Sequence, residues 1–403
     1  MGKIYVVGTC DTKDSELRFV KKLIEDSGLK TVLVDVSTTN HHSKADVTPP
    51  QIAAHHSKGT NAVFLDDRGL AVEAMASAFQ NYISIRDDVT AIIGLGGSGG
   101  TALITPAMRF LPVGTPKVMV STVASGNTAP YVGPSDICMM YSVTDVAGLN
   151  RISRQVLGNA ANAIVGMTVR QVPLPTNQKP AIGLTMFGVT TPCVNYITER
   201  LTETYDCLVF HATGTGGQSM EKLVDSKLIG GVIDVTTTEV CDLLMDGVMS
   251  AGEDRFGAII RTGVPYVGSC GALDMVNFGA RGTVPERYQN RNLYMHNPHV
   301  TLMRTTPDEN RLVGEWIGHK LNQCKGLVSF YLPEKGVSLM DVHGKAFHDP
   351  DADAALFEAL EKTVYQNSNR QIIRLPYNIN DPDFAQALLY GFIELNQSSQ
   401  LKT

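Results

Sequence analysis

The sequence predicts an α/β protein of two similar domains, each a parallel βαβ sheet flanked by helices, with a ligand cleft between them. Short apolar runs rich in β-branched residues alternate with segments of helical period, and the alternation restarts after a polar stretch with three prolines, Arg170–Pro180. We therefore expect an N-terminal domain over 1–170, a linker over 171–180 and a C-terminal domain over 181–403.

The first half reads as strands that each lead into a helix. Apolar residues recur at helical spacing within Asp14–Ser27, and Gly28 follows as a stop signal. His41–Gly59 shows no clear period and is expected to be loop with a short helix. The expected strands are Lys3–Val7, Thr31–Val36, Val89–Leu95 and Pro116–Ser121, and the expected helices are Asp14–Ser27, Leu70–Ile85, Gly100–Phe110 and Val143–Met167. Such alternation is typical of right-handed βαβ units in a parallel sheet.

The second half repeats this order. Its expected strands are Ala181–Met186, Cys207–Ala212, Ile229–Val235, Tyr266–Ser269, Leu327–Leu332 and Gln371–Leu375. Its expected helices are Thr191–Thr204, a segment after Gly217, Asp308–Cys324, Asp351–Gln366 and Asp381–Leu395. Two segment pairs look alike: IYVVGTCDTKDSELRFV with IGLTMFGVTTPCVNYIT, and IIGLGGSGGTAL with VFHATGTGGQSM. This likeness predicts two similar domains, as a duplication would produce.

Composition narrows the class of protein. The net charge of −6 and the lack of a basic run argue against general nucleic-acid binding. Seven scattered cysteines without CxxC spacing favour reduced thiols over a disulfide framework or a structural zinc. The apolar stretch at the N-terminus is too short for a signal peptide, and no segment is long enough to cross a bilayer. We therefore expect a cytoplasmic protein with neither nucleic-acid nor membrane partners.

The glycine-rich run GLGGSGGT, Gly94–Thr101, separates an expected strand from an expected helix. Glycine lets a backbone approach an anion closely, and the free amides at a helix start point toward it. The expected ligand contacts are Gly96, Gly97, Ser98, Gly99 and Thr101. The run lacks the Lys-Ser/Thr of a P-loop, and no acid ends a strand about 20 residues later, as an NAD site would require. The alternative is a tight turn without a ligand.

Two other turns are candidates for the same ligand. GTCDTKDSE follows the first strand and offers Gly8, Thr9, Asp11, Thr12 and Lys13. Asp11 could face a metal or ribose hydroxyls and Lys13 a phosphate, although these residues could also serve only the turn and a helix cap. The second turn offers Gly214, Gly216 and Gly217, and the alternative there is a plain strand-to-helix turn.

Candidate catalytic side chains come from the second half. Glu239 lies in the first turn of an expected helix, Asp274 lies in the unusual segment SCGALDMVNFG, and His296 belongs to MHNPHV. They could act as general bases, metal ligands or proton carriers. Each also has a structural alternative, as a helix-terminal acid, a buried polar group or a hydrogen-bonding imidazole. Cys270 is a weaker candidate nucleophile, because such a thiol is usually a small buried residue.

Taken in order, GTCDTKDSE, GLGGSGGT, HATGTGG, GALDMVNFG and HNPHVTLMRTT resemble a bacterial and plant family named after the ATP-binding domain of the tomato mosaic virus resistance protein. The resemblance spans nearly the whole chain. It implies two α/β domains with ATP and Mg²⁺ between them, and dimers. It also implies nucleotide contacts at the Gly8–Lys13, Gly96–Thr101 and Gly214–Gly217 turns. One departure is Cys270, where the family pattern leads us to expect proline.

These observations favour an ATP- and Mg²⁺-binding enzyme that acts on a small, oxygen-rich metabolite. The first domain would bind the nucleotide, and Glu239, Asp274 and His296 would handle the substrate. Two alternatives stay open: a nucleotide-independent lyase, hydrolase or isomerase of a sugar-acid type, and a non-catalytic binding protein that its nucleotide stabilises. We expect a homo-oligomer in each case. The sequence identifies neither the metal ligands nor the reaction.

Overall fold

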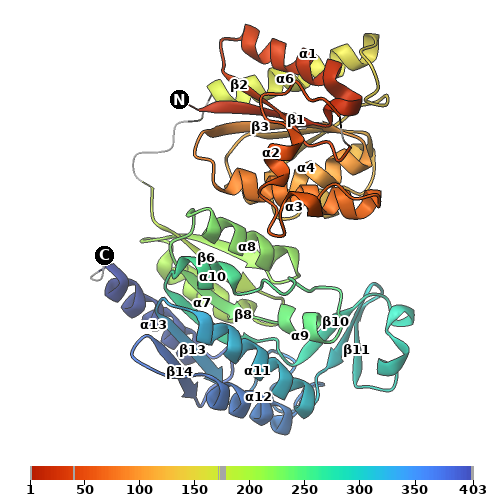
Figure 1. The fold of residues 1–403 in the computed structure, drawn as a ribbon. Coiled ribbons are helices and arrows are strands. Elements are labelled where there is room, and N and C mark those ends of the chain that lie inside the picture. The colour runs from red at the N-terminus through yellow and green to blue at the C-terminus, as the bar shows by residue number, and fades with distance from the viewer. Residues whose placement is uncertain (1, 40, 171, 173–177, 401–403) are drawn as a thin grey trace. The chain divides into compact units, whose positions relative to one another are not determined.

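The chain divides into two compact units, Met1–Leu174 and Pro175–Thr403. The computed structural model describes residues 2–39, 41–170, 172 and 178–400. The linker expected over 171–180 therefore falls largely outside the described residues. Within each unit, helices cover both faces of a parallel sheet, which confirms the predicted fold class (Figure 1). The predicted ligand cleft between the units stays a prediction.

Unit 1 is built on five parallel strands in the order β2-β1-β3-β4-β5. They are β1 (Lys3–Gly8), β2 (Thr31–Asp35), β3 (Val89–Gly96), β4 (Lys117–Ser121) and β5 (Cys138–Tyr141). The chain proceeds outward from β1 in one direction and from β3 in the other. The crevice beyond the carboxyl ends of β1 and β3 is thus the topological switch point, where open α/β sheets bind ligands.

Two helical layers bury the faces of this sheet. One layer holds α1 (Cys10–Asp26) and α6 (Arg151–Val169), and the other holds α2 (Pro49–Ala53), α3 (Arg68–Ser84) and α4 (Ser98–Phe110) (Figure 1). The short α5 (Ala129–Val132) precedes β5. Ile4 and Val6 face the first layer, whereas Tyr5 and Val7 face the second. Burial on both faces explains why these strands read as continuous apolar runs.

Unit 2 is built on six parallel strands in the order β14-β13-β9-β8-β6-β7. They are β6 (Ala181–Met186), β7 (Asp206–His211), β8 (Val232–Thr236), β9 (Tyr266–Gly271), β13 (Val328–Pro333) and β14 (Arg370–Leu375). Numbered by their own succession along the chain, these strands lie in the order 2-1-3-4-5-6. Unit 1 has the order 2-1-3-4-5, so the two units share one topology and unit 2 adds an edge strand.

Helices again cover both faces of the sheet in unit 2. One face packs against α8 (Thr215–Asp225), α10 (Gly257–Thr262), α11 (Pro307–Gln323) and α12 (Pro350–Thr363). The other packs against α7 (Thr191–Leu201) and α13 (Pro382–Gln400). The short α9 (Glu239–Leu244) follows β8. The hydrophobic cores on the two faces of this sheet are separate, because alternate residues of each strand point to opposite faces.

The sequence did not predict the small antiparallel sheet of unit 2. Its strands are β10 (Met275–Phe278), β11 (Leu293–Asn297) and β12 (Val300–Arg304), in the order β10-β12-β11. They are four or five residues long, and β11 and β12 flank a Pro298–His299 turn. Polar residues interrupt these strands, Asn277 in β10 and His296 and Asn297 in β11, so they do not appear as apolar runs in the sequence.

Two other expectations were wrong in detail. The helix expected from Val143 begins at Arg151, because Asn150 accepts hydrogen bonds from the amides of Ile152 and Ser153 and caps it there. The likeness between IIGLGGSGGTAL and VFHATGTGGQSM is not topological, since the first covers the third strand of its unit and the second covers the second strand. The other pair, β1–α1 and β6–α7, occupies equivalent places.

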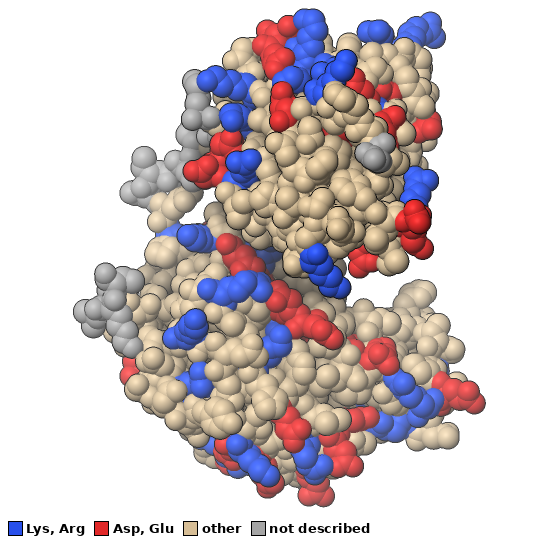
Figure 2. Space-filling view, viewed as in Figure 1, with Lys and Arg blue, Asp and Glu red and all other residues tan. Residues whose placement is uncertain are grey.

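The apolar character of the helices and the charge of the surface are the properties that membrane or nucleic-acid binding would require. None of the described helices combines the length and the apolar character needed to cross a membrane. Lys and Arg are interspersed with Asp and Glu on the face shown in Figure 2, without a large patch of one sign. All seven cysteines are free in the structure.

Candidate functional site

Two of the three predicted ligand turns meet at the carboxyl edge of the unit 1 sheet. β1 and β3 are adjacent and parallel, with Val7 opposite Gly94. The turns that follow them, Gly8–Lys13 and Gly96–Thr101, therefore emerge side by side at the switch point. The third turn, Gly214–Gly217, belongs to unit 2 and follows β7, an edge strand.

The N-terminus of α4 is open. Gly97 is its N-cap residue and has no side chain to cap the helix, and the first helical bond runs from the Thr101 amide to the Gly97 carbonyl at 2.9 Å. Among the described residues, nothing accepts a hydrogen bond from the amides of Ser98, Gly99 or Gly100. Unpaired amides and the helix dipole together make such an end attractive to anions.

The fold itself requires only some of the glycines in this turn. A Cβ on Gly96 would lie 2.8 Å from the Cα of Gly100, so Gly96 is needed for tight packing. On Gly97 or Gly100, by contrast, a Cβ would come no closer than 3.6 Å to another group, and neither residue has a positive φ. Alanine would fit at both positions, and its absence leaves space for a group that approaches the backbone from outside.

Arg68 adds a positive charge to the turn. It is the first residue of α3, and a Cβ placed on Gly99 would lie 3.8 Å from its Nη2. Its side chain is exposed and forms no ion pair with a described residue. The sequence gives no sign of this contact, because α3 and α4 meet only in the folded unit. The turn therefore presents amides and a guanidinium to the same space.

The neighbouring helix α1 is capped from within the protein. Asp35, fully buried at the end of β2, accepts the Cys10 amide at 3.0 Å, and Ser37 Oγ accepts the Asp11 amide at 3.3 Å. The remaining oxygen of Asp35 lies 2.9 Å from His41 Nε2. Asp35 was missed as well, although an acid at the end of the second strand is a recognisable signal.

The other predicted residues of the β1–α1 turn also contact the protein. Asp11 Oδ2 accepts a hydrogen bond from the Thr39 hydroxyl at 2.5 Å, and the hydroxyls of Thr9 and Thr12 lie 2.9 Å apart. Lys13 Nζ donates to the carbonyl of Val146 at 2.5 Å. The turn is thus close to the open end of α4, but the predicted nucleotide contacts of Gly8, Thr9, Asp11, Thr12 and Lys13 stay predictions.

Thr101 has a structural contact of its own. Its buried hydroxyl donates to the Gly97 carbonyl at 2.7 Å and lies 2.6 Å from Ser121 Oγ. These contacts fix the turn to β4. Of the predicted residues in this turn, the backbone of Gly97, Ser98 and Gly99 is available to a ligand, and Gly96 and Thr101 hold the turn in shape.

The glycine turn of unit 2 is filled by a carboxylate of the protein. Glu239 Oε1 accepts the amides of Gly214 and Gly217 at 2.7 and 3.1 Å. A Cβ on Gly217 would lie 2.1 Å from Glu239 Oε2, and one on Gly216 would lie 1.8 Å from the His211 carbonyl oxygen. The fold explains these glycines without a ligand. The predicted nucleotide contact of Gly214, Gly216 and Gly217 stays a prediction without support from this geometry.

Glu239 also belongs to a buried ionic cluster around Arg255. The guanidinium donates to Glu239 at 2.9 Å, to Glu221 at 3.1 Å and to Asp234 at 2.7 Å. Burial raises the pKa of Glu221 to about 7 and also raises that of Glu239, although Arg255 opposes both shifts. With both oxygens engaged and almost no exposed surface, Glu239 acts in this structure as a structural counter-ion.

Asp274 lies in a second buried cluster. Its Oδ2 accepts from the Ser338 hydroxyl at 2.8 Å, and its Oδ1 is buried with no hydrogen-bond partner among the described residues. Burial raises its pKa to about 6, against the effect of Arg304. Arg304 itself donates to Asp341 at 3.2 Å and to Asp353 at 2.9 Å. Burial and the neighbouring Asp274 and Asp353 raise the pKa of Asp341 well above its usual range.

His296 is remote from Asp274. It is an exposed residue of β11, next to Met295, which pairs with Thr301 on β12. Asp274 precedes Met275, which pairs with Arg304 at the other end of β12. Three residues of strand separate these points, roughly 10 Å along β12. Asp274 and His296 therefore do not share one site, and both oxygens of Glu239 already have protein partners. The catalytic roles of all three residues stay predictions.

Neither a reactive Cys270 thiolate nor a cluster of metal-binding side chains is favoured by the described residues. Cys270 is fully buried, and burial raises the pKa of its thiol well above the usual value, which disfavours the reactive thiolate. Within the described part of the chain, no group of three or more His, Cys, Asp or Glu side chains is arranged to hold a metal ion.

Comparison with known proteins identifies the lineage of both units. Residues 2–173 match the N-terminal domain of the uncharacterised protein family UPF0261, and residues 179–396 match its C-terminal domain. The chain belongs to the UPF0261 family. The UPF0261 protein mlr3387 of Mesorhizobium japonicum is 60% identical over 96% of this chain and 98% of its own length.

A plant relative is also similar to this UPF0261 chain. The tomato mosaic virus resistance protein Tm-1(GCR237) of Solanum lycopersicum is 44% identical over 99% of this chain, which corresponds to 56% of the tomato protein. The predicted relationship to this plant protein is thus confirmed at the level of the family, and ATP binding is not tested by it. A solved structure titled as a putative hydrolase from Rickettsia typhi covers 57% of this chain and 88% of its own, at 13% identity and a TM-score of 0.25, too slight a likeness to support a conclusion.

Proposed function

We propose that unit 1 binds the phosphate groups of a nucleotide, ATP with Mg²⁺, at the N-terminus of α4. The observation that carries this proposal is the open turn: unpaired amides at Ser98, Gly99 and Gly100 beside glycines that the fold does not require. Arg68 supplies a guanidinium, which suits phosphate geometry. The turn also lies at the switch point of a doubly wound sheet.

The choice of ATP and Mg²⁺ rests on the motif resemblance, since amides and a guanidinium recognise phosphate and not a base. Mg²⁺ is usually held by one or two carboxylates together with substrate phosphates and water. Asp11, in the adjacent turn, is the carboxylate that would serve here, and its second oxygen makes no hydrogen bond with a described residue. This arrangement agrees with the lack of a three-residue metal cluster in the described chain.

Whether the nucleotide reacts is a separate question. The first candidate is an ATP-dependent enzyme that acts on a small, oxygen-rich metabolite. The separation of Asp274 from His296 along β12, and the protein partners on both oxygens of Glu239, favour a second, a protein that its nucleotide stabilises without turnover. Both require the same phosphate site. We also propose a cytoplasmic homo-oligomer, supported by the free thiols and by the family resemblance, which implies dimers.

The test is nucleotide binding to wild type and to Gly99→Ala, measured by calorimetric titration with ATP-Mg²⁺, ADP-Mg²⁺ and pyrophosphate. The matched control is Gly158→Ala in α6, where an added Cβ meets nothing within 4 Å. Both substitutions should leave the free energy of unfolding unchanged or raise it by up to about 1 kcal/mol, because alanine favours helix. Only Gly99→Ala should weaken binding, by tenfold or more.

Ligand linkage gives a second readout. At a hundredfold excess over Kd, ATP-Mg²⁺ should stabilise wild type and Gly158→Ala by about 2.7 kcal/mol. Equal stabilisation of Gly99→Ala would place the nucleotide elsewhere. Absence of binding by any of the three ligands would remove the proposal, and phosphorylated sugars and sugar acids would then be the ligands to screen.

A further inference from the structure

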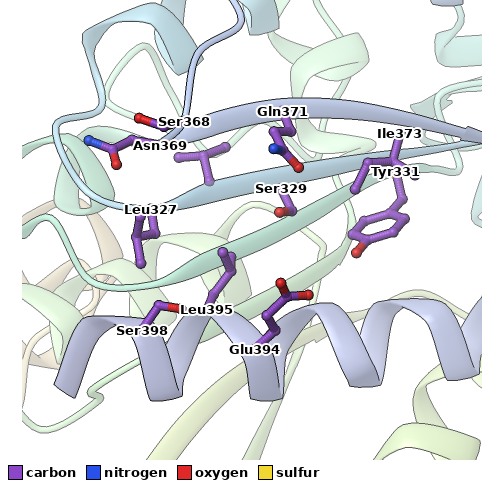
Figure 3. Close-up of a pocket in the computed structure, with 11 residues that line it drawn as sticks. Leu327, Ser329, Tyr331, Ser368, Asn369, Gln371, Ile373, Glu394, Leu395 and Ser398 are labelled. Carbon is purple, nitrogen blue, oxygen red and sulfur yellow. The ribbon is translucent and has the colours of Figure 1, made fainter. Parts of the chain in front are cut away.

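Unit 2 contains a cavity of about 240 Å³ between its sheet and α13 (Figure 3). β13 and β14 form one wall, and α13 forms the other. The cavity reaches the amino ends of these strands, where Leu327 precedes β13 and Asn369 precedes β14. It is therefore distinct from the phosphate site, which lies at the carboxyl edge of the other unit.

Two of the hydroxyl groups that line this cavity belong to buried residues and have no partner among the described residues. Ser329 and Tyr331 on β13 are each 6% exposed, and neither hydroxyl makes a hydrogen bond with another described residue. Neither oxygen is among the fully buried polar atoms that lack a partner, so both stay accessible from the cavity. Burial and the negative charge of Glu394 raise the pKa of Tyr331 to about 12, so its hydroxyl keeps its proton at neutral pH and can donate it. Both hydroxyls are positioned to bind a ligand in the cavity.

The opposite wall supplies a negative charge. Glu394 on α13 projects into the space that Tyr331 faces, as Figure 3 shows. It is exposed and forms no ion pair with a described residue. No other residue that lines the cavity is charged, and Gln371 on β14 adds an amide. A carboxylate without a counter-ion, facing two hydroxyls and an amide, favours a cation and disfavours an anion.

We propose that this cavity binds a small hydroxylated cation, an amino sugar or amino polyol. The ammonium group would pair with Glu394, and hydroxyls of the ligand would satisfy Ser329 and Tyr331. The volume lies below the usual range of about 300–1,000 Å³ for drug-sized ligands, which suits a molecule of about six carbons. The site is independent of the proposed nucleotide site in place and in the sign of the charge it recognises.

The test compares three six-carbon chains that differ in charge: D-glucamine, D-sorbitol and D-gluconate, which are cationic, neutral and anionic at pH 7.5. Binding to the full chain is measured by ligand-observed NMR titration. We expect D-glucamine to bind at least about fivefold more tightly than D-sorbitol, because a hydrogen bond to an ionised group is roughly twice as strong as a neutral one. D-gluconate should not bind.

Substitutions of the residues that line the cavity test which of them contact the ligand. Glu394→Gln should remove the preference for D-glucamine over D-sorbitol, and Tyr331→Phe should weaken both by threefold or more. Glu286→Gln, an exposed acid outside the cavity, is the matched control and should change neither. Circular dichroism melts establish that each variant is folded, and Ser329→Ala replaces Tyr331→Phe if the latter is not. Failure of D-glucamine to bind wild type, or binding unaffected by Glu394→Gln, would overturn the proposal.

Discussion

At the residue scale, Glu239 connects a helix terminus to a buried cation. Its carboxylate accepts two backbone amides and pairs with Arg255 while almost fully buried. Removing one partner of a buried pair leaves an uncompensated charge and unsatisfied amides, a loss of about 3–5 kcal/mol. We therefore expect Glu239→Ala to lower the free energy of unfolding by about that amount in urea titrations.

Glu239→Gln should cost less, because the amide oxygen can still accept from Gly214 and Gly217 while Arg255 keeps two carboxylates. Exposed Glu286, replaced by alanine, serves as the control and should cost less than about 0.5 kcal/mol. A loss below about 1 kcal/mol for Glu239→Ala would show that the carboxylate is not the counter-ion the structure depicts.

The burial of Asp242 predicts how the free energy of unfolding depends on pH. It is fully buried and accepts from the amide and the side chain of Asn277, and burial raises its pKa to about 7. An unfolded aspartate titrates near pH 4. Between about pH 4 and 7 the native state thus holds more protons than the unfolded state, so this group stabilises the fold most at low pH and less as the pH rises.

The difference in unfolding free energy between wild type and Asp242→Asn should therefore be most favourable to wild type near pH 4 and shrink toward pH 7. Urea titrations across this range measure it, with Asp206→Asn, an exposed aspartate, as control. A difference that stays constant with pH would mean that Asp242 is not protonated preferentially in the native state.

Residue-level sequence reasoning located the open turn but not its surroundings. Gly96–Thr101 was recognisable because five glycines follow an apolar run. Arg68 lies about 30 positions earlier, and only the packing of α3 against α4 brings it to Gly99. The partner that occupies Gly214 and Gly217 was itself predicted, as a catalytic acid, because spacing along a chain does not reveal which way a carboxylate turns.

At the element scale, α6 depends on a cap that the apolar pattern concealed. Asn150 accepts from the amides of Ile152 and Ser153, and Ser153 Oγ accepts from the Asn150 amide in return. Asn150→Ala should lower the free energy of unfolding by about 1 kcal/mol in denaturant titrations, whereas Asn150→Ser should lose less than half of that. Equal losses for the two variants would indicate that the side chain acts by some means other than capping.

The same scale shows why elements differ in predictability. Except for β5, the strands of the two parallel sheets, from Lys3–Gly8 to Arg370–Leu375, were recognisable as apolar runs between turn residues. β5, β10, β11 and β12 were not predicted, and β11 is largely exposed, so burial leaves no apolar run there. Their positions depend on pairing with neighbours, which the local sequence does not encode.

At the scale of the whole molecule, each unit has hydrophobic cores of its own. Two clusters fill unit 1, and the three clusters of unit 2 share no residue with them. We therefore expect residues 1–170, produced alone, to fold and to unfold cooperatively. Urea unfolding followed by circular dichroism and by tyrosine fluorescence should give coincident transitions. A fragment without a cooperative transition would show that unit 1 requires the rest of the chain.

Of the two segment pairs that look alike in the sequence, only one reflects the strand order that the two units share. The likeness between the β1–α1 and β6–α7 segments is genuine in the fold, but the two glycine runs follow non-equivalent strands. Glycine-rich turns arise wherever a strand meets a helix closely, so a match between two of them is weak evidence of equivalence. The topology itself, read from hydrogen-bonded neighbours, is what relates the units.

The true counterpart of the β3–α4 turn is the β8–α9 turn, and α9 begins at Glu239 where α4 begins at Ser98. In one unit this place leaves its amides open, and in the other it carries a carboxylate that fills an adjacent turn. In evolutionary terms, a lineage could gain or lose affinity for a soluble anion in either half by substitutions at this one location. The sheet that supports it would not have to change.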